Sequence, residues 1–194
     1  MTRDRARAVA LAAIMVVSMV AVGAGFAGSA VAQEETLVVT DDPGDGEYAS
    51  IPAALDAAAP GDSISVQTDQ IITSPDNRVV VDTNASGARL DGVSIVADGD
   101  VTIRYEQPDE EAPGVNPGYP TFDVQADNVT ISGFTIELDT NDVYDGDDRF
   151  AQAIKVGGFQ ASGGSGVEIL NNNISFVGDV NNNISSVGVG LIDP

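Results

Sequence analysis

The chain has 194 residues, a formal net charge of −22, and neither cysteine nor histidine. Without cysteine no disulfide can form, and without histidine a Ser-His-Asp arrangement and a His-ligated zinc site are excluded. The strong negative charge argues against nucleic acid and anionic membrane surfaces as partners.

The acidic composition also indicates the solvent in which the protein works. Aspartate and glutamate number 30 against 8 lysines and arginines, and the acids are spread along the chain rather than clustered. Such a chain repels itself in ordinary salt, whereas in molar salt the Debye length falls to about 3 Å and the repulsion is largely screened. We therefore expect a protein of a halophilic microbe, with an acidic Ca²⁺-binding extracellular protein as the alternative.

Residues 1–32 have the features of a secretory signal peptide. Arginines at the start precede a long apolar stretch, and Ala30-Val31-Ala32 has the small-x-small form that signal peptidase accepts. We expect cleavage after Ala32 and a secreted or cell-surface protein that is no longer attached to the membrane. An uncleaved N-terminal anchor is the alternative.

The next part of the sequence, 33–62, predicts a strand followed by one short helix. TLVVT (36–40) is rich in the residues that strands favour. Ser50 suits an N-cap and Pro52 suits the first helical turn, and the apolar residues that follow lie on one helical face. The dipeptide Pro60-Gly61 then ends the helix.

From 63 to 194 the sequence predicts short strands joined by Gly, Asp and Asn turns, for which a meander sandwich is the default. However, the pattern Val-x-Ile-x-x-Phe-x-Ile at 129–136 recurs with identical spacing as Val-x-Ile-x-x-Asn-x-Ile at 167–174. Residues 101–103 begin the same pattern. Repeats of one unit with inserts of variable length indicate a solenoid.

Two runs of three asparagines, 171–173 and 181–183, interrupt this β pattern, although asparagine is a poor strand former. At a tight bend, asparagine tolerates left-handed backbone angles, and its amide can hydrogen-bond equivalent amides above and below. Asn172 occupies the bend position that Phe134 holds one repeat earlier. We therefore expect Asn172 to belong to an asparagine ladder, with a polar surface loop as the alternative.

Three stretches resemble right-handed parallel β-helix proteins of the pectin-lyase-like type. They are YASIPAALDAAAPGDSISV (48–66), DNVTISGFTIEL (127–138) and GVEILNNNIS (166–175). The resemblance implies an all-β fold, a right-handed parallel β-helix solenoid with a short N-terminal capping α-helix, whose coils occupy 63–194. The chain departs from the family after the first strand, where QTDQIITSPDN (67–77) stands in place of Pro-Gly-x-Tyr.

The chain is also short for this family, and it stops just after an apolar strand, VGVGLI (187–192). A solenoid needs a cap at both ends, and an open β edge invites pairing with another chain. We therefore expect an N-terminal portion of a longer protein, or self-association through the open C-terminal β edge.

Possible chemistry follows only from the resemblance, because this fold hosts lyases, glycoside hydrolases and surface proteins without known activity. Lyases of the fold use a carboxylate-bound Ca²⁺ together with an Arg or Lys base. The best local match is DTNDVYDGDDRF (139–150), whose carboxylates are hard oxygen ligands, with an acidic surface loop as the alternative. The expected Ca²⁺ ligands are Asp142, Asp145, Asp147 and Asp148, and the candidate catalytic residues are Arg149 and Lys155.

Surface features of the sequence add two further sets of candidates. Sequons mark possible N-glycan sites, among which Asn84 lies in a predicted loop and Asn173 qualifies only if it points away from the ladder. The sequons begin at Asn84, Asn128, Asn173 and Asn183. Tryptophan, the usual residue that stacks on sugars, is absent, and Tyr105, Tyr119 and Tyr144 could substitute for it.

Two functions remain open. The first is a secreted or cell-surface protein that binds polysaccharide or serves as a structural surface component, presenting a long β face to its partner. The alternative is a Ca²⁺-dependent polysaccharide lyase, or a glycoside hydrolase with two carboxylates, acting on an acidic glycan. No catalytic arrangement stands out from the acidic background of the sequence, which favours the binding protein.

Overall fold

The computed structural model describes residues 34–72, 78–105, 120–139, 149–157, 163–177 and 184–191. Contacts within the chain divide it into two units, Met1–Gln33 and Glu34–Pro194, and the expected signal peptide lies outside the described residues. In the part that is described, no helix is long and apolar enough to cross a membrane.

Short strands and a single helix make up the regular structure of the described residues. The helix, α2 (Ile51–Ala57), begins after the N-cap Ser50, whose side chain accepts a hydrogen bond from the Ala53 N–H, and Pro52 lies in its first turn. This confirms the helix that the sequence predicts. The strands are β1 (Thr36–Val39), β2 (Glu47–Tyr48), β3 (Ser63–Val66), β4 (Gln70–Ile72), β5 (Val79–Val81), β6 (Ser94–Ala97), β7 (Thr102–Tyr105), β8 (Phe122–Val124), β9 (Thr130–Ser132), β10 (Thr135–Asp139), β11 (Arg149–Val156), β12 (Glu168–Leu170), β13 (Asn173–Val177) and β14 (Ile184–Leu191).

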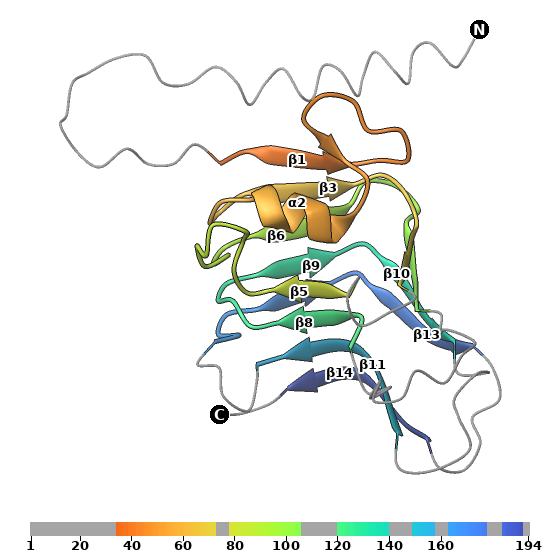
Figure 1. Cartoon of the computed structure of the whole chain (residues 1–194). Helices are drawn as coiled ribbons and strands as arrows, with labels where there is room; N and C mark the ends of the chain where they lie inside the picture. Colours follow the sequence, from red (N-terminus) through yellow and green to blue (C-terminus); the bar gives the residue numbers. More distant parts are fainter. Residues whose placement is uncertain are drawn as a thin grey trace, which may run out of the picture. The chain divides into compact units, whose positions relative to one another are not determined.

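These strands form three sheets in which neighbouring named strands are parallel. Sheet A has the order β12-β9-β6-β3-β1-β2, sheet B the order β13-β10-β7-β4, and sheet C the order β14-β11-β8-β5. From β3 onward the chain passes from sheet A to B to C and back to A, always in that order (Figure 1). We call each passage a round, so that β3–β5, β6–β8, β9–β11 and β12–β14 are rounds 1 to 4.

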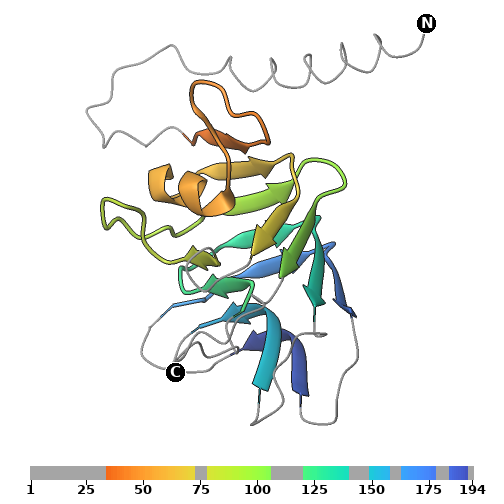
Figure 2. The same ribbon diagram turned by 45° about the vertical axis from the view of Figure 1, so that its right-hand side comes forward.

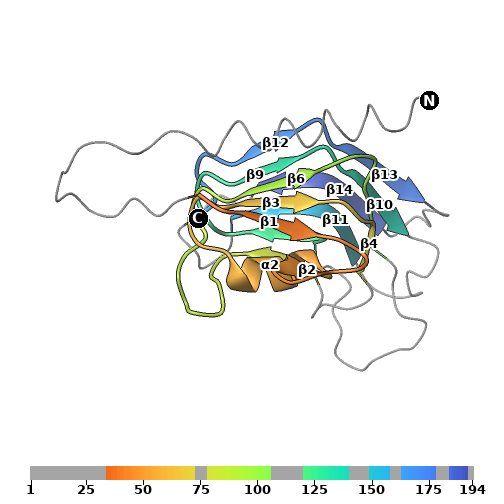
Figure 3. The same cartoon turned by 90° about the horizontal axis from the view of Figure 1, so that it is seen from above.

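The strand-rich, parallel arrangement agrees with the all-β class predicted from the sequence. It excludes the antiparallel meander sandwich that a string of short strands also allows. Seen from above, β1, β3, β6, β9 and β12 lie side by side across sheet A, and α2 lies next to β2 (Figure 3). Each round therefore contributes one strand to each of the three sheets.

Between the sheets lies an apolar core in which equivalent residues of successive rounds stack in register. In sheet A, Ile64 pairs with Ile95 and Ile95 with Ile131, and all three side chains are fully buried. Phe134, at the bend that leads into sheet B, packs against Phe122 of sheet C with 5.9 Å between their ring centroids. The apolar positions of the repeated sequence pattern are thus the inward positions of each round.

Each round enters sheet A through a bend whose residue has a positive φ angle. The bend residues stack, since Gly92 N–H donates to the Asp127 carbonyl at 2.8 Å and Asn128 N–H to the Ser165 carbonyl at 2.7 Å. Glycine adopts this conformation without strain, and asparagine tolerates it better than most other residues. The bend residues are Gly61, Gly92, Asn128 and Gly166, with φ angles of 87°, 78°, 57° and 69°.

Candidate functional site

The outer face of sheet A presents the side chains that alternate with the buried core residues. Strand register aligns these outer positions in two rows that cross β1, β3, β6, β9 and β12. All of them are exposed or half-buried, and Glu168 is the one that carries a charge. The first row is Thr36, Ser63, Ser94, Thr130 and Glu168, and the second row is Val38, Ser65, Val96, Ser132 and Leu170.

This face differs in chemistry from the acidic composition of the chain. Its first row carries small hydroxyl groups at four positions and Glu168 at the fifth, and its second row alternates apolar and hydroxyl side chains. Because neighbouring strands lie about 4.8 Å apart, the four hydroxyl groups of the first row repeat at that spacing across the sheet. Each hydroxyl can donate one hydrogen bond and accept others. The face therefore offers hydrogen-bonding groups and apolar contacts in turn along its length.

The outer face of sheet C instead carries an ion cluster around Asp123. Register places Asp123 of β8 beside Val80 of β5 and Lys155 of β11. Lys155 Nζ lies 3.3 Å from Asp123 Oδ1, and Arg78 Nη2 lies 3.9 Å from Asp123 Oδ2. Although Asp123 points away from the core, it is only 3% exposed. A buried carboxylate is costly unless it is paired, so both cations compensate its charge.

Thr121, two residues before Asp123, is fully buried, and its hydroxyl has no hydrogen-bond partner among the described residues. Lys155 is the one predicted catalytic residue whose side chain is described, and the structure brings it together with Asp123 and Arg78. Neither Asp123 nor Arg78 was predicted from the sequence as a site residue. The sequence pattern at Asp123, a polar residue between two apolar ones in β8, is equally typical of an ordinary exposed strand position.

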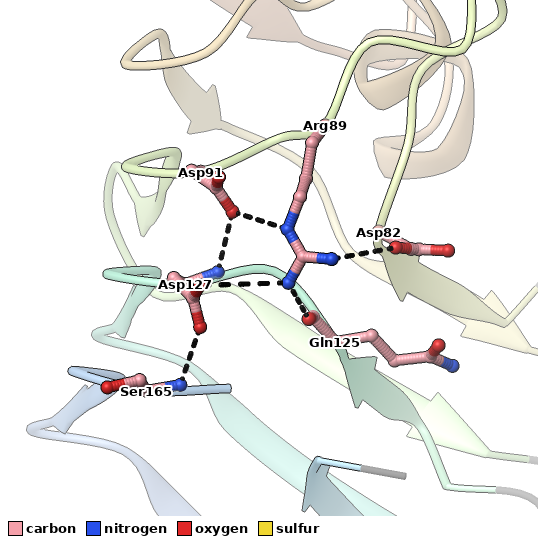
Figure 4. Close-up of polar contacts among 6 residues, drawn as sticks. All are labelled: Asp82, Arg89, Asp91, Gln125, Asp127 and Ser165. Carbon is pink, nitrogen blue, oxygen red and sulfur yellow. Dashed lines mark hydrogen bonds and ion pairs between the residues drawn. The ribbon is translucent and has the colours of Figure 1, made fainter. Parts of the chain in front are cut away.

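A second ion cluster surrounds Arg89 at the bend between sheets C and A (Figure 4). Arg89 Nε donates to Asp91 Oδ1 at 2.9 Å, and Nη2 donates to the Gln125 carbonyl at 2.6 Å. Nη1 lies 4.0 Å from Asp82 Oδ1, and Nη2 lies 3.8 Å from Asp127 Oδ2. One guanidinium thus neutralises part of the charge of three carboxylates that come from two successive bends.

The carboxylates of this cluster also tie successive rounds together. Asp91 Oδ1 accepts from the Asp127 N–H at 2.8 Å, and Asp127 Oδ1 accepts from the Ser165 N–H at 2.8 Å. The hydrogen bond from the Asp127 N–H lowers the pKa of Asp91 despite partial desolvation, and Arg89 lowers it further. A side-chain carbon at Gly163 would overlap the Arg89 guanidinium and the Gln125 carbonyl, so the chain passes closely over the cluster. These contacts indicate a structural staple.

The predicted Ca²⁺ site and most of its partners cannot be placed. Asp142, Asp145, Asp147 and Asp148 lie outside the described residues. Arg149 begins β11, where its backbone pairs with Ile184, but its side chain is not among those described. Among the residues whose placement is described, no group of three or more acidic, His or Cys side chains could hold a metal ion. The Ca²⁺ site therefore stays a prediction.

The hydrogen-bond partners of Asn172 differ from those of the expected asparagine ladder. Its Oδ1 accepts from the Phe134 N–H at 3.0 Å, and its Nδ2 donates to the Ile131 carbonyl at 2.9 Å. Round 3 offers no asparagine amide to pair with Asn172, because Phe134 holds the equivalent position there. Asn171, one residue earlier, has a φ angle of 55° and takes the place of Gly133. The asparagines thus fix the bend through backbone groups of the preceding round.

The sequons differ in how far the fold uses their asparagines. Asn84 Nδ2 donates to the Ala58 carbonyl at 2.7 Å, and Asn84 Oδ1 accepts from the Ser86 and Ala88 N–H groups. The nitrogen to which a glycan would be attached at Asn84 is therefore engaged in the fold. Asn128 and Asn173 are exposed, and Asn183 lies outside the described residues.

Of the tyrosines considered as a sugar-stacking surface, Tyr105 lies in the core and is 8% exposed. Burial raises the pKa of its hydroxyl. Tyr105 is therefore excluded from that role, because its position in β7 points inward, like Ile103 two residues before it. Tyr119 and Tyr144 lie outside the described residues.

The sheet A outer face and the two ion clusters can also be compared with known proteins. No family model, curated protein or solved structure matches this chain. What the chain binds or does must therefore be inferred from these three features, of which only the sheet A outer face is both extended and accessible along its length.

Proposed function

We propose that the protein is a right-handed parallel β-helix that works outside the cell as a polysaccharide-binding surface protein in a salt-rich environment. The fixed rotation of the chain through three parallel sheets supports the β-helix. Crossovers between parallel strands of one sheet are right-handed in about 98% of cases, which supports the handedness. The signal-like residues 1–32 support export, and the net charge of −22 supports a halophilic source.

The observation that carries the proposal is the chemistry of the sheet A outer face. Ten aligned positions on five strands include one acidic residue, in a chain with 30. The hydroxyls of its two rows can hydrogen-bond sugar hydroxyls, and Val38, Val96 and Leu170 offer apolar contacts to the C–H surfaces of sugar rings. A flat row of such groups suits an extended glycan chain better than a small molecule, which favours a concave site.

The net charge of the protein indicates which class of glycan it binds. An acidic polysaccharide approaching a protein with a net charge of −22 is repelled, and a neutral polysaccharide is not. Molar salt screens the long-range repulsion but not a contact between like charges. The ligand we propose is therefore a neutral polysaccharide rather than the acidic glycan that the lyase alternative requires.

The experiment is a binding assay of the secreted protein with insoluble neutral and acidic polysaccharides in molar KCl. The test variant is Ser65→Glu/Ser132→Glu, which places two charges in the second row on strands that are not neighbours. The control is Ala53→Glu/Ala85→Glu, which makes the same change in net charge at two exposed positions outside sheet A. We expect binding to a neutral glycan that the test variant loses and the control keeps. Equal binding by both variants, or binding to acidic glycans alone, would show that the proposal is wrong.

The lyase alternative has one observation in its favour, the convergence of Lys155 and Arg78 on the outer face of sheet C. A Ca²⁺-dependent lyase would release unsaturated sugar ends from polygalacturonate, and Lys155→Ala would abolish the reaction. Arg104→Ala is the matched control, because Arg104 pairs with Glu137 on sheet B. If the unaltered protein releases no unsaturated ends with or without Ca²⁺, the lyase alternative fails and the binding protein remains.

A further inference from the structure

Asn128 holds a bend position at which the other three rounds have glycine. Its φ angle of 57° lies in the left-handed region, which glycine adopts without strain and asparagine at some cost. The equivalent residues of rounds 1, 2 and 4 are Gly61, Gly92 and Gly166. Both side views show β9, which follows Asn128, between its neighbours β6 and β12 in sheet A (Figure 1, Figure 2). The bend needs no side chain at this position, so the fold does not account for the asparagine of round 3.

The side chain of Asn128 is accessible and is not held by the fold. Asn128 is exposed, and among the described residues its side-chain amide makes no hydrogen bond. Its Oδ1 lies over Gly166, where a side-chain carbon would overlap it, so the glycine of round 4 leaves room for the amide. The Asn128 amide therefore has an unused nitrogen at an exposed position.

Asn128 also begins the sequence Asn-Val-Thr, the acceptor pattern for N-linked glycans. The middle residue, Val129, is fully buried in the core, whereas Thr130 lies on the sheet A outer face and is half-buried. The Thr130 hydroxyl likewise makes no hydrogen bond within the part of the chain that the structure describes. The two residues that define the acceptor are therefore accessible from outside, and the residue between them anchors the strand.

The sequon at Asn84 is the opposite case. Asn84 Nδ2 donates to the Ala58 carbonyl, and Ser86 Oγ donates to Asn84 Oδ1 at 2.7 Å. Its amide and its hydroxyl are thus both engaged within the fold, and Asn84 is half-buried. A sugar on Asn84 Nδ2 would compete with the hydrogen bond to Ala58. The folded protein therefore disfavours a glycan at Asn84, whether the sugar is attached before or after folding.

We propose that Asn128 carries an N-linked glycan in the exported protein. The donor is an oligosaccharide activated as the phosphate ester of a lipid. Asn128 Nδ2 forms a bond to the anomeric carbon of the sugar, the bond from that carbon to the phosphate oxygen breaks, and the lipid phosphate leaves with the proton that Nδ2 loses. This inference rests on the export that the proposed function includes, but not on polysaccharide binding.

The test is mass spectrometry of the protein purified from the cells that produce it naturally, after cleavage at acidic residues, which separates Asn84 from Asn128. We expect the Asn128 peptide to gain the mass of a whole number of sugar residues, and the Asn84 peptide to have its unmodified mass. Asn128→Gly should lose the added mass and keep the fold, because the other rounds have glycine at this bend. The matched control is Asn171→Gly, the same change at an asparagine with a φ angle of 55° that begins no sequon, which should keep the added mass.

Two variants of Thr130 separate glycosylation from folding. Thr130→Val removes the sequon hydroxyl but keeps a β-branched side chain in β9, so the added mass should be lost, whereas Thr130→Ser keeps the hydroxyl and should keep the mass. An unmodified Asn128 in the natural protein would overturn the inference. A glycan on Asn84, or added mass at Asn128 that persists in Thr130→Val, would overturn it as well. The N-terminal residue of the same sample and its binding to neutral polysaccharide report separately on the proposed function.

Discussion

Rounds 3 and 4 share one sequence pattern but differ in how deeply its apolar residues are buried. Ile131 and Ile169 occupy equivalent, paired positions in sheet A, and Ile136 and Ile174 do so in sheet B. The round 3 residues are fully buried, whereas their round 4 counterparts are half-buried. A round is thus not stable by its own sequence. Its apolar residues contribute fully to stability only when another round or another molecule covers them.

The largest difference should appear when the same side chain is truncated in each round. Ile131→Ala should lower the free energy of unfolding by about 2–5 kcal/mol, because it opens a cavity in a closed core. Ile169→Ala should cost only about 1 kcal/mol, because the half-buried side chain is already partly hydrated. Denaturant unfolding of both variants in molar KCl measures the difference. Equal losses would mean that the Ile169 side chain is as fully covered as that of Ile131.

The bend leading into sheet B sharpens the comparison, because Phe134 of round 3 is replaced there by Asn172. Asn172→Ala leaves the Phe134 N–H and the Ile131 carbonyl without partners, which should cost about 1–3 kcal/mol. Asn173→Ala is the control, because the Asn173 side chain is exposed. Denaturant unfolding measures the two losses, and hydrogen exchange of the Phe134 amide should accelerate in Asn172→Ala only. An unchanged Phe134 amide would show that the side-chain hydrogen bond is not formed.

Some features of the fold and of the candidate site could be predicted from the sequence, and others could not. The spacing of apolar residues in 129–136 and 167–174 predicts the inward positions, because period and burial are linked by strand geometry. The partners of Asn172 could not be predicted, because they are backbone atoms of another round. The buried state of Asp123 and the neutral rows of the sheet A outer face depend on register between distant strands. The inserts of variable length between rounds hide that register from a single sequence.

The bends into sheet A offer a smaller test, since round 3 begins at Asp127 and round 4 at Ser165. Asp127→Ala removes the acceptor for the Ser165 N–H and one carboxylate beside Arg89, which should cost about 1 kcal/mol after allowing for solvent screening. Ser165→Ala should change the free energy of unfolding by less than about 0.5 kcal/mol, because Ser165 contributes its backbone N–H. Unfolding of both variants at the same salt concentration makes the comparison. A larger loss in Ser165→Ala would mean that its hydroxyl has a structural role.

The smallest effect concerns pH and the start of round 2. The pKa of Asp91 is lowered in the folded protein, chiefly by the hydrogen bond from the Asp127 N–H and also by Arg89. A carboxylate with a lowered folded pKa stabilises the protein above its unfolded pKa of about 3.9, and this stabilisation is lost as pH falls through the folded pKa. Thermal unfolding at pH 7 and below pH about 3 should therefore show a smaller acid-induced loss in Asp91→Asn than in the unaltered protein. Identical losses would mean that the carboxylate of Asp91 is no better accommodated when folded than when unfolded, so the staple joining rounds 2 and 3 would have to depend on Arg89 and the backbone alone.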